Sequence, residues 1–170
     1  MRLATTSSRD ITLAHQDLQR LFRDLKEWWL VNGDGSRIII TQSTRDCRDQ
    51  ELYYSQGKSK ARCGQSLHNY EPSLAIDIAF VKKDGTLNWN RKPFDKIGKY
   101  VKGIGFEWGG DFPNFYDGGH LQLPMTYQQA KAGEIVSVYP SENTTQEKAI
   151  LSLLSLCIKA LEQIKSLIQR

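Results

Sequence analysis

The first strong helical pattern in the chain covers residues 7–33, SSRDITLAHQDLQRLFRDLKEWWLVNG. Apolar side chains recur in it at helical intervals, which places them on one face of a helix. Ser8 or Asp10 can cap the start of this helix, and Gly33 can end it. We expect the apolar face to pack against the core rather than bind a ligand. It consists of Ile11, Leu18, Leu21, Phe22, Leu25, Trp28 and Trp29.

Strand patterns follow at 37–43, RIIITQS, and at 73–85, SLAIDIAFVKKDG, where a Lys-Asp-Gly turn ends the second strand. A shorter strand, HLQLP, is predicted at 120–124 and stops at its proline. Helices are predicted over three further segments, 48–57, 92–105 and 126–134. Because helices and strands mix without regular βαβ alternation, the pattern favours an α+β fold.

The end of the chain has a different pattern. A polar linker, VYPSENTTQEK at 138–148, precedes a strongly amphipathic helix that runs to residue 170. We therefore divide the chain into a domain over 1–140 and a linker with a C-terminal helix over 141–170. The apolar stripe of this helix is too large to leave in water, so we expect it to dock on its own domain, to dimerise or to meet a membrane surface. Its longest apolar run, 149–161, is too short and too polar to span a bilayer.

Composition narrows the possible partners. The chain has 170 residues, 39% of them hydrophobic and 25% charged, which is ordinary for one globular domain with a real core. A net charge of +4 and a pI near 8.9 suit contact with an anionic polymer, such as nucleic acid or bacterial cell wall. The basic residues are scattered and form no binding motif, so a nucleic-acid binder is disfavoured.

The chain has three cysteines, Cys47, Cys63 and Cys157, and no CxxC pair. The odd number argues against a disulfide framework, so we expect reduced and mostly buried cysteines, with a single Cys47–Cys63 bridge as the alternative. The N-terminal segment lacks the apolar stretch of a signal peptide. We expect a protein made in the cytoplasm, whose export would need another route.

Candidate chemistry centres on two of the three histidines. His15 lies in the first predicted helix, where a surface or packing role is expected, whereas His68 and His120 lie in polar segments beside acids. Asp77 lies on a strongly apolar strand, with alanines as its neighbours on the same strand face. A buried carboxylate must be paired, hydrogen-bonded or bound to a metal, so Asp77 either pairs with an arginine or backbone amides or binds a metal ion.

His68, Asp77 and His120 together offer the nitrogen and oxygen ligands of a catalytic zinc site, with a fourth position open to water. Zinc lowers the pKa of bound water, but a base must still take its proton and pass it to the leaving amine. Asp117, three residues before His120, can supply that base. Its simpler role is to open the Asp-Gly-Gly turn, and both roles are compatible.

These motifs resemble those of a known enzyme family. SLH at 66–68, AID at 75–77 and DGGH at 117–120 follow the pattern of the zinc peptidases that cut bacterial cell-wall peptides. These are the D-alanyl-D-alanine carboxypeptidases and dipeptidases and the L-alanyl-D-glutamate endopeptidases of phage endolysins. The resemblance covers roughly 7–123, and GFEWGGDFPNFYDGGHLQ at 105–122 is most similar to the endolysin branch.

The resemblance implies a small α+β domain of the hedgehog/D,D-peptidase type, with a mostly antiparallel sheet and a zinc ion between sheet and loops. Position by position, His68, Asp77 and His120 match the zinc ligands of the family, and Asp117 matches its catalytic base. Arg45 matches an arginine that helps to hold the substrate and the developing oxyanion. Its alternative is a surface residue at a helix start. Ser66 matches a serine near the site, as a positioning residue rather than a nucleophile.

One segment departs from the family pattern. Asp77 lies nine positions after His68, a longer spacing than is usual in the family, and Glu71-Pro72-Ser73 stands where a glycine is expected. Glu71 could therefore replace, crowd or gate a ligand position.

Our leading hypothesis is a zinc-dependent L-alanyl-D-glutamate endopeptidase that cuts peptidoglycan stem peptides, released by a phage-type route. The alternatives are a D-alanyl-D-alanine carboxypeptidase with the same site, or an impaired module that only binds zinc or cell wall.

Overall fold

The computed structural model describes residues 1–139 and residue 153. The chain divides into two compact units, Met1–Val138 and Tyr139–Arg170. The linker and C-terminal helix expected over 141–170 lie outside the described residues, apart from Leu153, which is helical. The first unit holds the predicted site and is described below.

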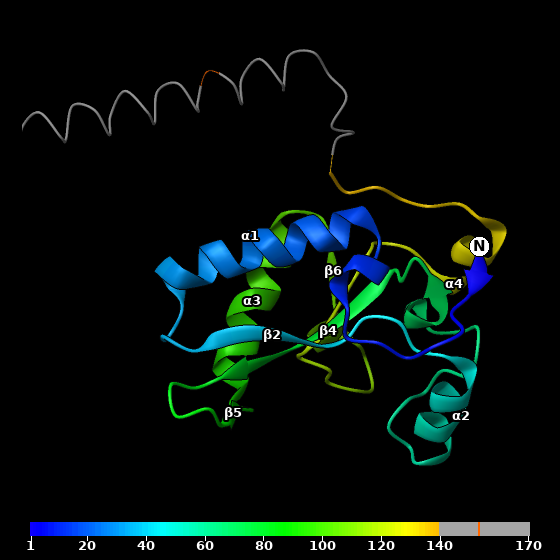
Figure 1. Ribbon diagram of the computed structural model, residues 1–170, viewed down its shortest axis with the longest axis horizontal. Coiled ribbons are helices and arrows are strands. Elements are labelled where there is room, and N and C mark those ends of the chain that lie inside the picture. Colours follow the sequence, from blue (N-terminus) through cyan, green and yellow to red (C-terminus); the bar gives the residue numbers. More distant parts are fainter. Residues whose placement is uncertain (140–152, 154–170) are drawn as a thin grey trace, which may run out of the picture. The chain divides into compact units, whose positions relative to one another are not determined.

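The first unit is built on an antiparallel sheet (Figure 1). Four strands follow in the order β2-β4-β7-β6, and β5 pairs with β4 as a fifth strand. These strands are β2 (Arg37–Gln42), β4 (Ala75–Val81), β5 (Leu87–Asn88), β6 (Glu107–Trp108) and β7 (His120–Gln122). A separate two-stranded sheet pairs β1 (Arg2–Leu3) with β3 (Tyr70–Glu71). The predicted α+β fold with a mostly antiparallel sheet is confirmed.

Every helix predicted within 1–139 is present. The α-helices are α1 (Gln16–Asn32), α2 (Cys47–Ser55), α3 (Arg91–Gly103) and α4 (Tyr127–Ala132). Three short 3-10 helices, η1 (Ile11–Leu13), η2 (Leu67–Asn69) and η3 (Gly109–Asp111), lie in the connections. No helix within the described residues is both long and apolar enough to cross a membrane.

The predicted first helix was too long at its N-terminal end. Asp10 caps η1, where its carboxylate accepts a hydrogen bond from the Thr12 amide at 2.9 Å. The α-helix begins only after His15, because the backbone before it bonds elsewhere. The His15 amide donates to the Ser73 carbonyl, and the Ser73 amide donates to the Leu13 carbonyl, each at 2.8 Å. This segment is therefore fixed against the chain that leads into β4.

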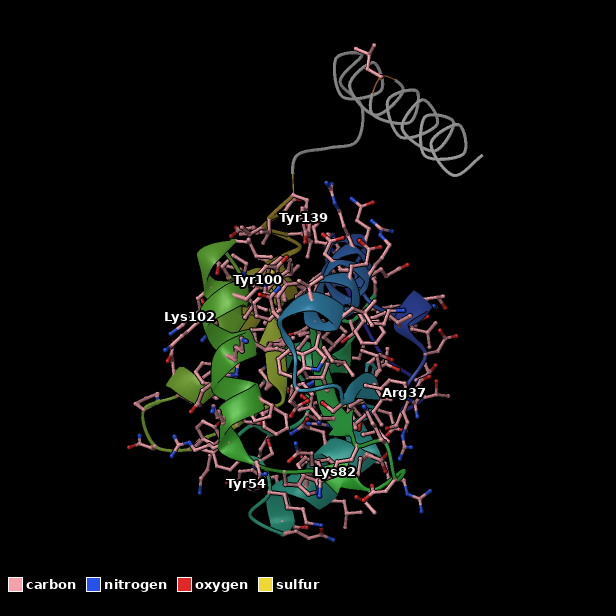
Figure 2. The ribbon with its side chains drawn as sticks, turned by 90° about the vertical axis from the view of Figure 1, so that its left-hand side faces the viewer. Arg37, Tyr54, Lys82, Tyr100, Lys102 and Tyr139 are labelled. Carbon is pink, nitrogen blue, oxygen red and sulfur yellow. A yellow bond between two sulfur atoms is a disulfide. The ribbon has the colours of Figure 1, made fainter. Side chains whose placement is uncertain are left out.

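One face of β4 is covered by α1 and α3. The ring of Phe80 lies 4.8 Å from that of Trp29 on α1 and 4.8 Å from that of Phe94 on α3. Tyr100 reaches from α3 towards α1 (Figure 2), where its ring stacks on Trp28 at 4.5 Å. Aromatic contacts at these distances stabilise the layer beyond the area they bury.

The buried face of β4 fixes which way Asp77 points. Ile76, Ile78 and Phe80 are almost completely buried, and burying each side chain contributes about 1.5–3 kcal/mol. Because strand side chains alternate, a slip of one residue would turn Asp77 into this apolar layer. The core therefore holds the Asp77 carboxylate on the opposite face of the sheet.

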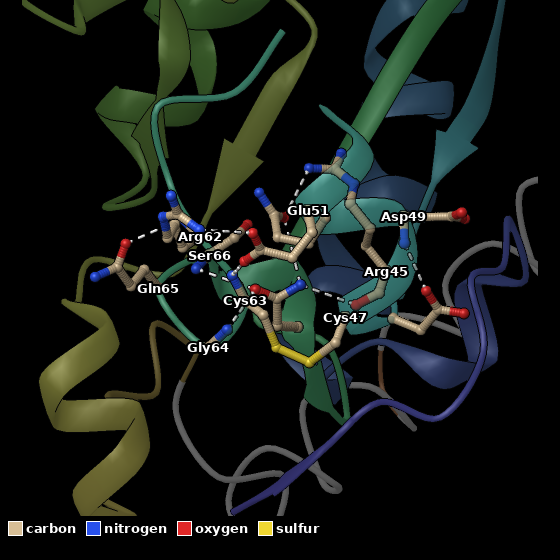
Figure 3. The surroundings of a disulfide bond; sticks show 12 residues. Arg45, Cys47, Asp49, Glu51, Arg62, Cys63, Gly64, Gln65 and Ser66 are labelled. Carbon is tan, nitrogen blue, oxygen red and sulfur yellow. Dashed lines mark hydrogen bonds and ion pairs between the residues drawn. A yellow bond between two sulfur atoms is a disulfide. The ribbon is translucent and has the colours of Figure 1, made fainter. Parts of the chain in front are cut away.

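A disulfide joins Cys47, the first residue of α2, to Cys63 in the connection before η2 (Figure 3). Their Cα atoms are 4.9 Å apart, within the usual range for a disulfide. The expectation of reduced cysteines is therefore wrong for this pair, and the alternative bridge is the one present. Glu51 explains the pairing locally, because its carboxylate accepts a hydrogen bond from the Cys63 amide at 2.8 Å and holds that connection against α2. Cys157 lies outside the described residues.

Candidate metal centre

Three elements bring the predicted ligands together. Asp77 on β4 and His120 on β7 are direct partners in the antiparallel register, so their side chains lie on the same face of the sheet. His68 comes from η2, a helical turn capped by Ser66, whose hydroxyl accepts from the His68 amide at 3.4 Å. Within the described residues, this is the group of His, Cys, Asp or Glu side chains placed to hold a metal ion.

The donor atoms of this group are nearly equidistant. His68 Nε2 lies 3.1 Å from Asp77 Oδ1 and 3.2 Å from His120 Nδ1. His120 Nδ1 lies 3.0 Å from Asp77 Oδ1. A tetrahedral zinc ion with bonds of about 2.0–2.1 Å has ligand atoms roughly 3.3 Å apart. A small outward movement of the three side chains would admit such an ion.

The outer nitrogens of both histidines have acceptor partners. His68 Nδ1 lies 2.7 Å from the Ser43 carbonyl, which can only accept, so this nitrogen carries the proton. His120 Nε2 lies 2.9 Å from Gln122 Oε1. The amide of Gln122 is oriented by Glu107, which accepts from Gln122 Nε2 at 2.7 Å. Metal-binding histidines commonly have such partners, which fix the ring and its tautomer.

With these tautomers, two nitrogen lone pairs and a carboxylate oxygen converge on one point. Three acceptors at this distance repel one another unless positive charge lies between them. His68 and His120 oppose the effect of burial and hold the pKa of Asp77 well below its usual value, so the Asp77 carboxylate is negatively charged. Burial lowers the pKa of His68. Burial has the same effect at His120, but the hydrogen bond and charge of Asp77 outweigh it and raise the pKa of His120. The site attracts a cation, and the residues fit a metal ion.

Arg45 is placed differently from a surface residue at a helix start. It lies just before α2 and is buried, with one guanidinium nitrogen 3.1 Å from Asp77 Oδ2 and the other 3.3 Å from Gln50 Oε1. Its Nε is buried without a hydrogen-bond partner in the described structure. The guanidinium thus binds the Asp77 oxygen that faces away from the histidines, and it also lines the cleft described below.

Asp117 forms the turn that its sequence position suggested, and its side chain lies at the cleft. Its carbonyl accepts from the His120 amide at 3.1 Å, which closes the Asp-Gly-Gly turn. Its carboxylate has no hydrogen-bond partner among the described residues and lines the cleft beside the three ligands. Burial raises the pKa of Asp117, and the negative charge of Asp77 raises it further. A carboxylate in this position is suited to exchanging protons.

Two glycines allow the close approach that the site requires. A Cβ at Gly109 would lie 2.5 Å from the Asp117 carbonyl and 2.8 Å from the His120 Cβ. A Cβ at Gly119 would lie 2.7 Å from the Ile78 carbonyl. Neither distance is possible for a real side chain without movement of the backbone. The glycines of WGGDF and DGGH therefore let η3, the turn and β4 pack directly against one another.

A cleft of about 970 Å³ opens over the three ligands. Arg45, Ser66 and Asp117 line it together with His68, Asp77 and His120. Its other lining residues include the aromatic side chains of Tyr53, Trp89, Phe112, Phe115 and Tyr127. A cleft of this size with a few convergent polar groups is typical of a ligand site.

The insertion between His68 and Asp77 does not reach this cleft. Glu71 pairs in β3 with β1, and its carboxylate accepts from the Arg2 guanidinium at 2.7 Å. Ser73 is buried, and its hydroxyl donates to the Ser43 carbonyl at 2.8 Å. Neither residue lines the cleft, so Glu71 does not crowd the ligands as the sequence suggested it could.

Comparison with known proteins agrees with this geometry. Residues 59–123, which contain all three ligands and Asp117, match the family model described as D-alanyl-D-alanine carboxypeptidase. The chain is 36% identical over 105 residues to the peptidoglycan L-alanyl-D-glutamate endopeptidase CwlK of Bacillus subtilis, an alignment that covers 52% of this chain and 62% of that protein.

The chain is also similar to a phage peptidase and to one solved structure. The L-alanyl-D-glutamate peptidase of Listeria phage A118 is 32% identical over 105 residues, covering 59% of this chain and 34% of that peptidase. The chain thus spans less than two thirds of the length of either curated relative. The crystal structure of the L-Ala D-Glu endopeptidase ChiX of Serratia marcescens superposes with a TM-score of 0.56 at 24% identity, covering 71% of this chain and 86% of that one. This likeness supports the fold.

Sequence reasoning did not find the residues that orient the ligands. Gln122 lies two residues after His120 on the same strand face, so the period of two could have indicated it. Ser43 and Gln50 gave no comparable signal, because they come close to the site only through the pairing of β2 and the start of α2.

Proposed function

We propose that this protein is a zinc-dependent peptidase that cuts the stem peptide of peptidoglycan at the L-alanyl-D-glutamate bond. The observation that carries the proposal is the convergence of the donor atoms of His68, Asp77 and His120 beside Asp117, whose carboxylate has no hydrogen-bond partner among the described residues. Two imidazoles and one carboxylate suit zinc better than calcium or magnesium, which prefer oxygen ligands. The named activities of the Bacillus and phage relatives support the choice of bond.

The metal ion, when bound by these ligands, supplies a Lewis acid that polarises the scissile carbonyl and acidifies water. The remaining steps belong to the chain's own side chains. Asp117 takes a proton from the attacking water and then gives it to the leaving amine, as its raised pKa and position in the cleft allow. Arg45, beside Asp77, stabilises the negative charge that develops on the oxyanion of the substrate.

A D-alanyl-D-alanine carboxypeptidase is the second candidate, because the matching family model has that description. The same ligands and base serve either reaction, and the bond would be selected by the cleft walls. An inert binding module is less well supported, because the Glu71-Pro72-Ser73 segment that suggested it does not line the cleft.

Muropeptide digestion followed by mass spectrometry separates these functions. The full chain with added zinc should release fragments with a new N-terminal D-glutamate. Loss of terminal D-alanine would identify a carboxypeptidase instead. The control is Asp117→Asn protein loaded with zinc, which should leave the muropeptides intact. Stoichiometric zinc binding without any cleavage by the unmodified chain would leave only the binding module.

A further inference from the structure

The connection between α2 and η2 forms one wall of the cleft. Lys58, Ser59, Lys60 and Ala61 line it from this side. The segment has no regular secondary structure apart from turns, yet it is firmly attached to α2. The Lys58 and Ser59 amides both donate to the Tyr53 carbonyl, at 2.9 and 3.2 Å.

A completely buried glutamine fixes the inner side of this wall. Gln50 Nε2 donates to the Ser59 hydroxyl at 2.9 Å and to the Ala61 carbonyl at 2.6 Å. Gln50 Oε1 accepts from Arg45 at 3.3 Å, so one side chain connects the wall to the guanidinium beside Asp77. Because Gln50 is buried, the loss of these bonds would leave its amide unpaired, which is costly.

A second set of contacts fixes the end of the wall that leads to Ser66. Figure 3 shows Glu51 reaching from α2 to Arg62 and Cys63, with hydrogen bonds of 3.1 and 2.8 Å. The Cys47–Cys63 disulfide joins the same two segments covalently. The wall is thus held in place before any ligand binds, which reduces the entropy cost of binding there.

The wall contributes two cations to the cleft. Lys58 and Lys60 both line it, and neither has a carboxylate partner in the described part of the chain. The ammonium group of Lys58 lies 5.9 Å from the centre of the Tyr53 ring. Arg45, in contrast, is already paired with Asp77. The lysines are the cleft's cations that remain available to a ligand.

We propose that Lys58 and Lys60 form a carboxylate-binding subsite that recognises the acidic residue next to the scissile bond. This inference rests on the proposed function. In an L-alanyl-D-glutamate bond, the glutamate has two carboxyl groups and its chain continues through one of them, so a free carboxylate lies close to the cleaved amide. Paired with an ammonium group in a partly desolvated cleft, that carboxylate forms a charge-assisted hydrogen bond. The subsite would thereby distinguish an acidic stem peptide from an amidated one.

The test uses two synthetic stem peptides that differ only at this group, one with the free carboxylate and one with the carboxamide. Lys58→Gln, Lys60→Gln and the double variant are compared with the unmodified chain. Lys99→Gln, an exposed lysine of α3 outside the cleft, is the matched control. The unmodified chain and the control should prefer the acidic peptide by roughly tenfold to a hundredfold in kcat/KM, the usual range for a hydrogen bond to a charged group.

In the double variant this preference should fall towards one, mainly through a higher KM for the acidic peptide. The inference is wrong if the unmodified chain does not distinguish the peptides, or if the double variant keeps the full preference. Calorimetric binding of both peptides to the zinc-loaded chain separates this failure from that of the proposed function. If peptide binding depends on the lysines but no peptide is cleaved, the subsite is retained and the peptidase is rejected. If both peptides are cleaved equally well, the peptidase is retained and the subsite is rejected.

Discussion

Replacing His68 with alanine should abolish the stabilisation of this protein by zinc. His68 is one of three donors that converge at 3.0–3.2 Å, so its loss leaves only Asp77 and His120 to hold the ion. Three protein ligands offer no redundancy, and two ligands bind zinc far more weakly. Asp77 and Gln122 would keep His120 in place, so the two remaining ligands should stay in position.

The magnitude follows from mass action. A ligand that binds the folded chain alone and is present at a hundred times its Kd stabilises it by about 2.7 kcal/mol. For a protein of this size, 1 kcal/mol raises Tm by about 2–4 °C, so zinc at that concentration should raise Tm by roughly 5–11 °C. The rise should disappear in His68→Ala, and metal analysis after gel filtration should show one zinc per unmodified chain and little in the variant.

The comparison must separate metal binding from folding, because His68 is also a core residue. It is 1% exposed, and its removal leaves a cavity that lowers Tm with or without zinc. The informative quantity is therefore the difference in Tm between zinc and EDTA for each protein. His15→Ala is the control, since it removes a histidine that caps α1, outside the site, and it should keep the full difference. If His68→Ala retained one zinc and an unchanged difference in Tm, His68 would not be a ligand.

Further substitutions test the residues around the ion. Asp117→Asn should keep the zinc and the fold but slow hydrolysis by about 10²–10⁴-fold. A near-normal rate in the zinc-loaded variant would show that Asp117 serves only to form the turn. Gln122→Leu removes the acceptor of His120 Nε2 and should weaken zinc binding about 10–100-fold in a chelator competition; unchanged affinity would show that the ring needs no such partner. Gly109→Ala places a Cβ 2.5 Å from the Asp117 carbonyl and should lower both Tm and activity, whereas Gly103→Ala, with open space around it, should lower neither. Arg45→Gln should weaken zinc binding. If the kcat of this variant stays low at saturating zinc, Arg45 also acts on the substrate; if kcat recovers fully, Arg45 acts only through Asp77.

The sequence predicted the positions of the helices and strands well where periodicity was strong. The predicted strand at 73–85 contains β4 (Ala75–Val81), in which every residue except Asp77 is buried. The first helix was misjudged because Asp10 is a good cap for either a 3-10 or an α-helix. Only the pairing of the backbone around Leu13 with Ser73, distant in sequence, decides between them.

The sequence also predicted which side chains come together at the candidate site, but not their surroundings. His68, Asp77, His120 and Asp117 belong to short motifs that can be compared one by one. The carbonyl of Ser43 contributes to the site through its backbone, so its side chain gives no indication of the contact with His68. The disulfide was uncertain for a similar reason, since cysteine spacing does not reveal that Glu51 holds the Cys63 segment against α2.

Asp77 shows why a single acid on an apolar strand could not be assigned from that strand alone. The sequence offered two explanations, a partner arginine or a metal ion, and treated them as alternatives. A carboxylate has two oxygens, and the structure gives each explanation one of them: Oδ2 bonds Arg45 at 3.1 Å, and Oδ1 faces both histidines. The pairing with Arg45 leaves Oδ1 free for an ion and fixes its direction. An arginine partner therefore supports the assignment of Asp77 as a metal ligand, because a ligand held from behind loses less entropy when the ion binds.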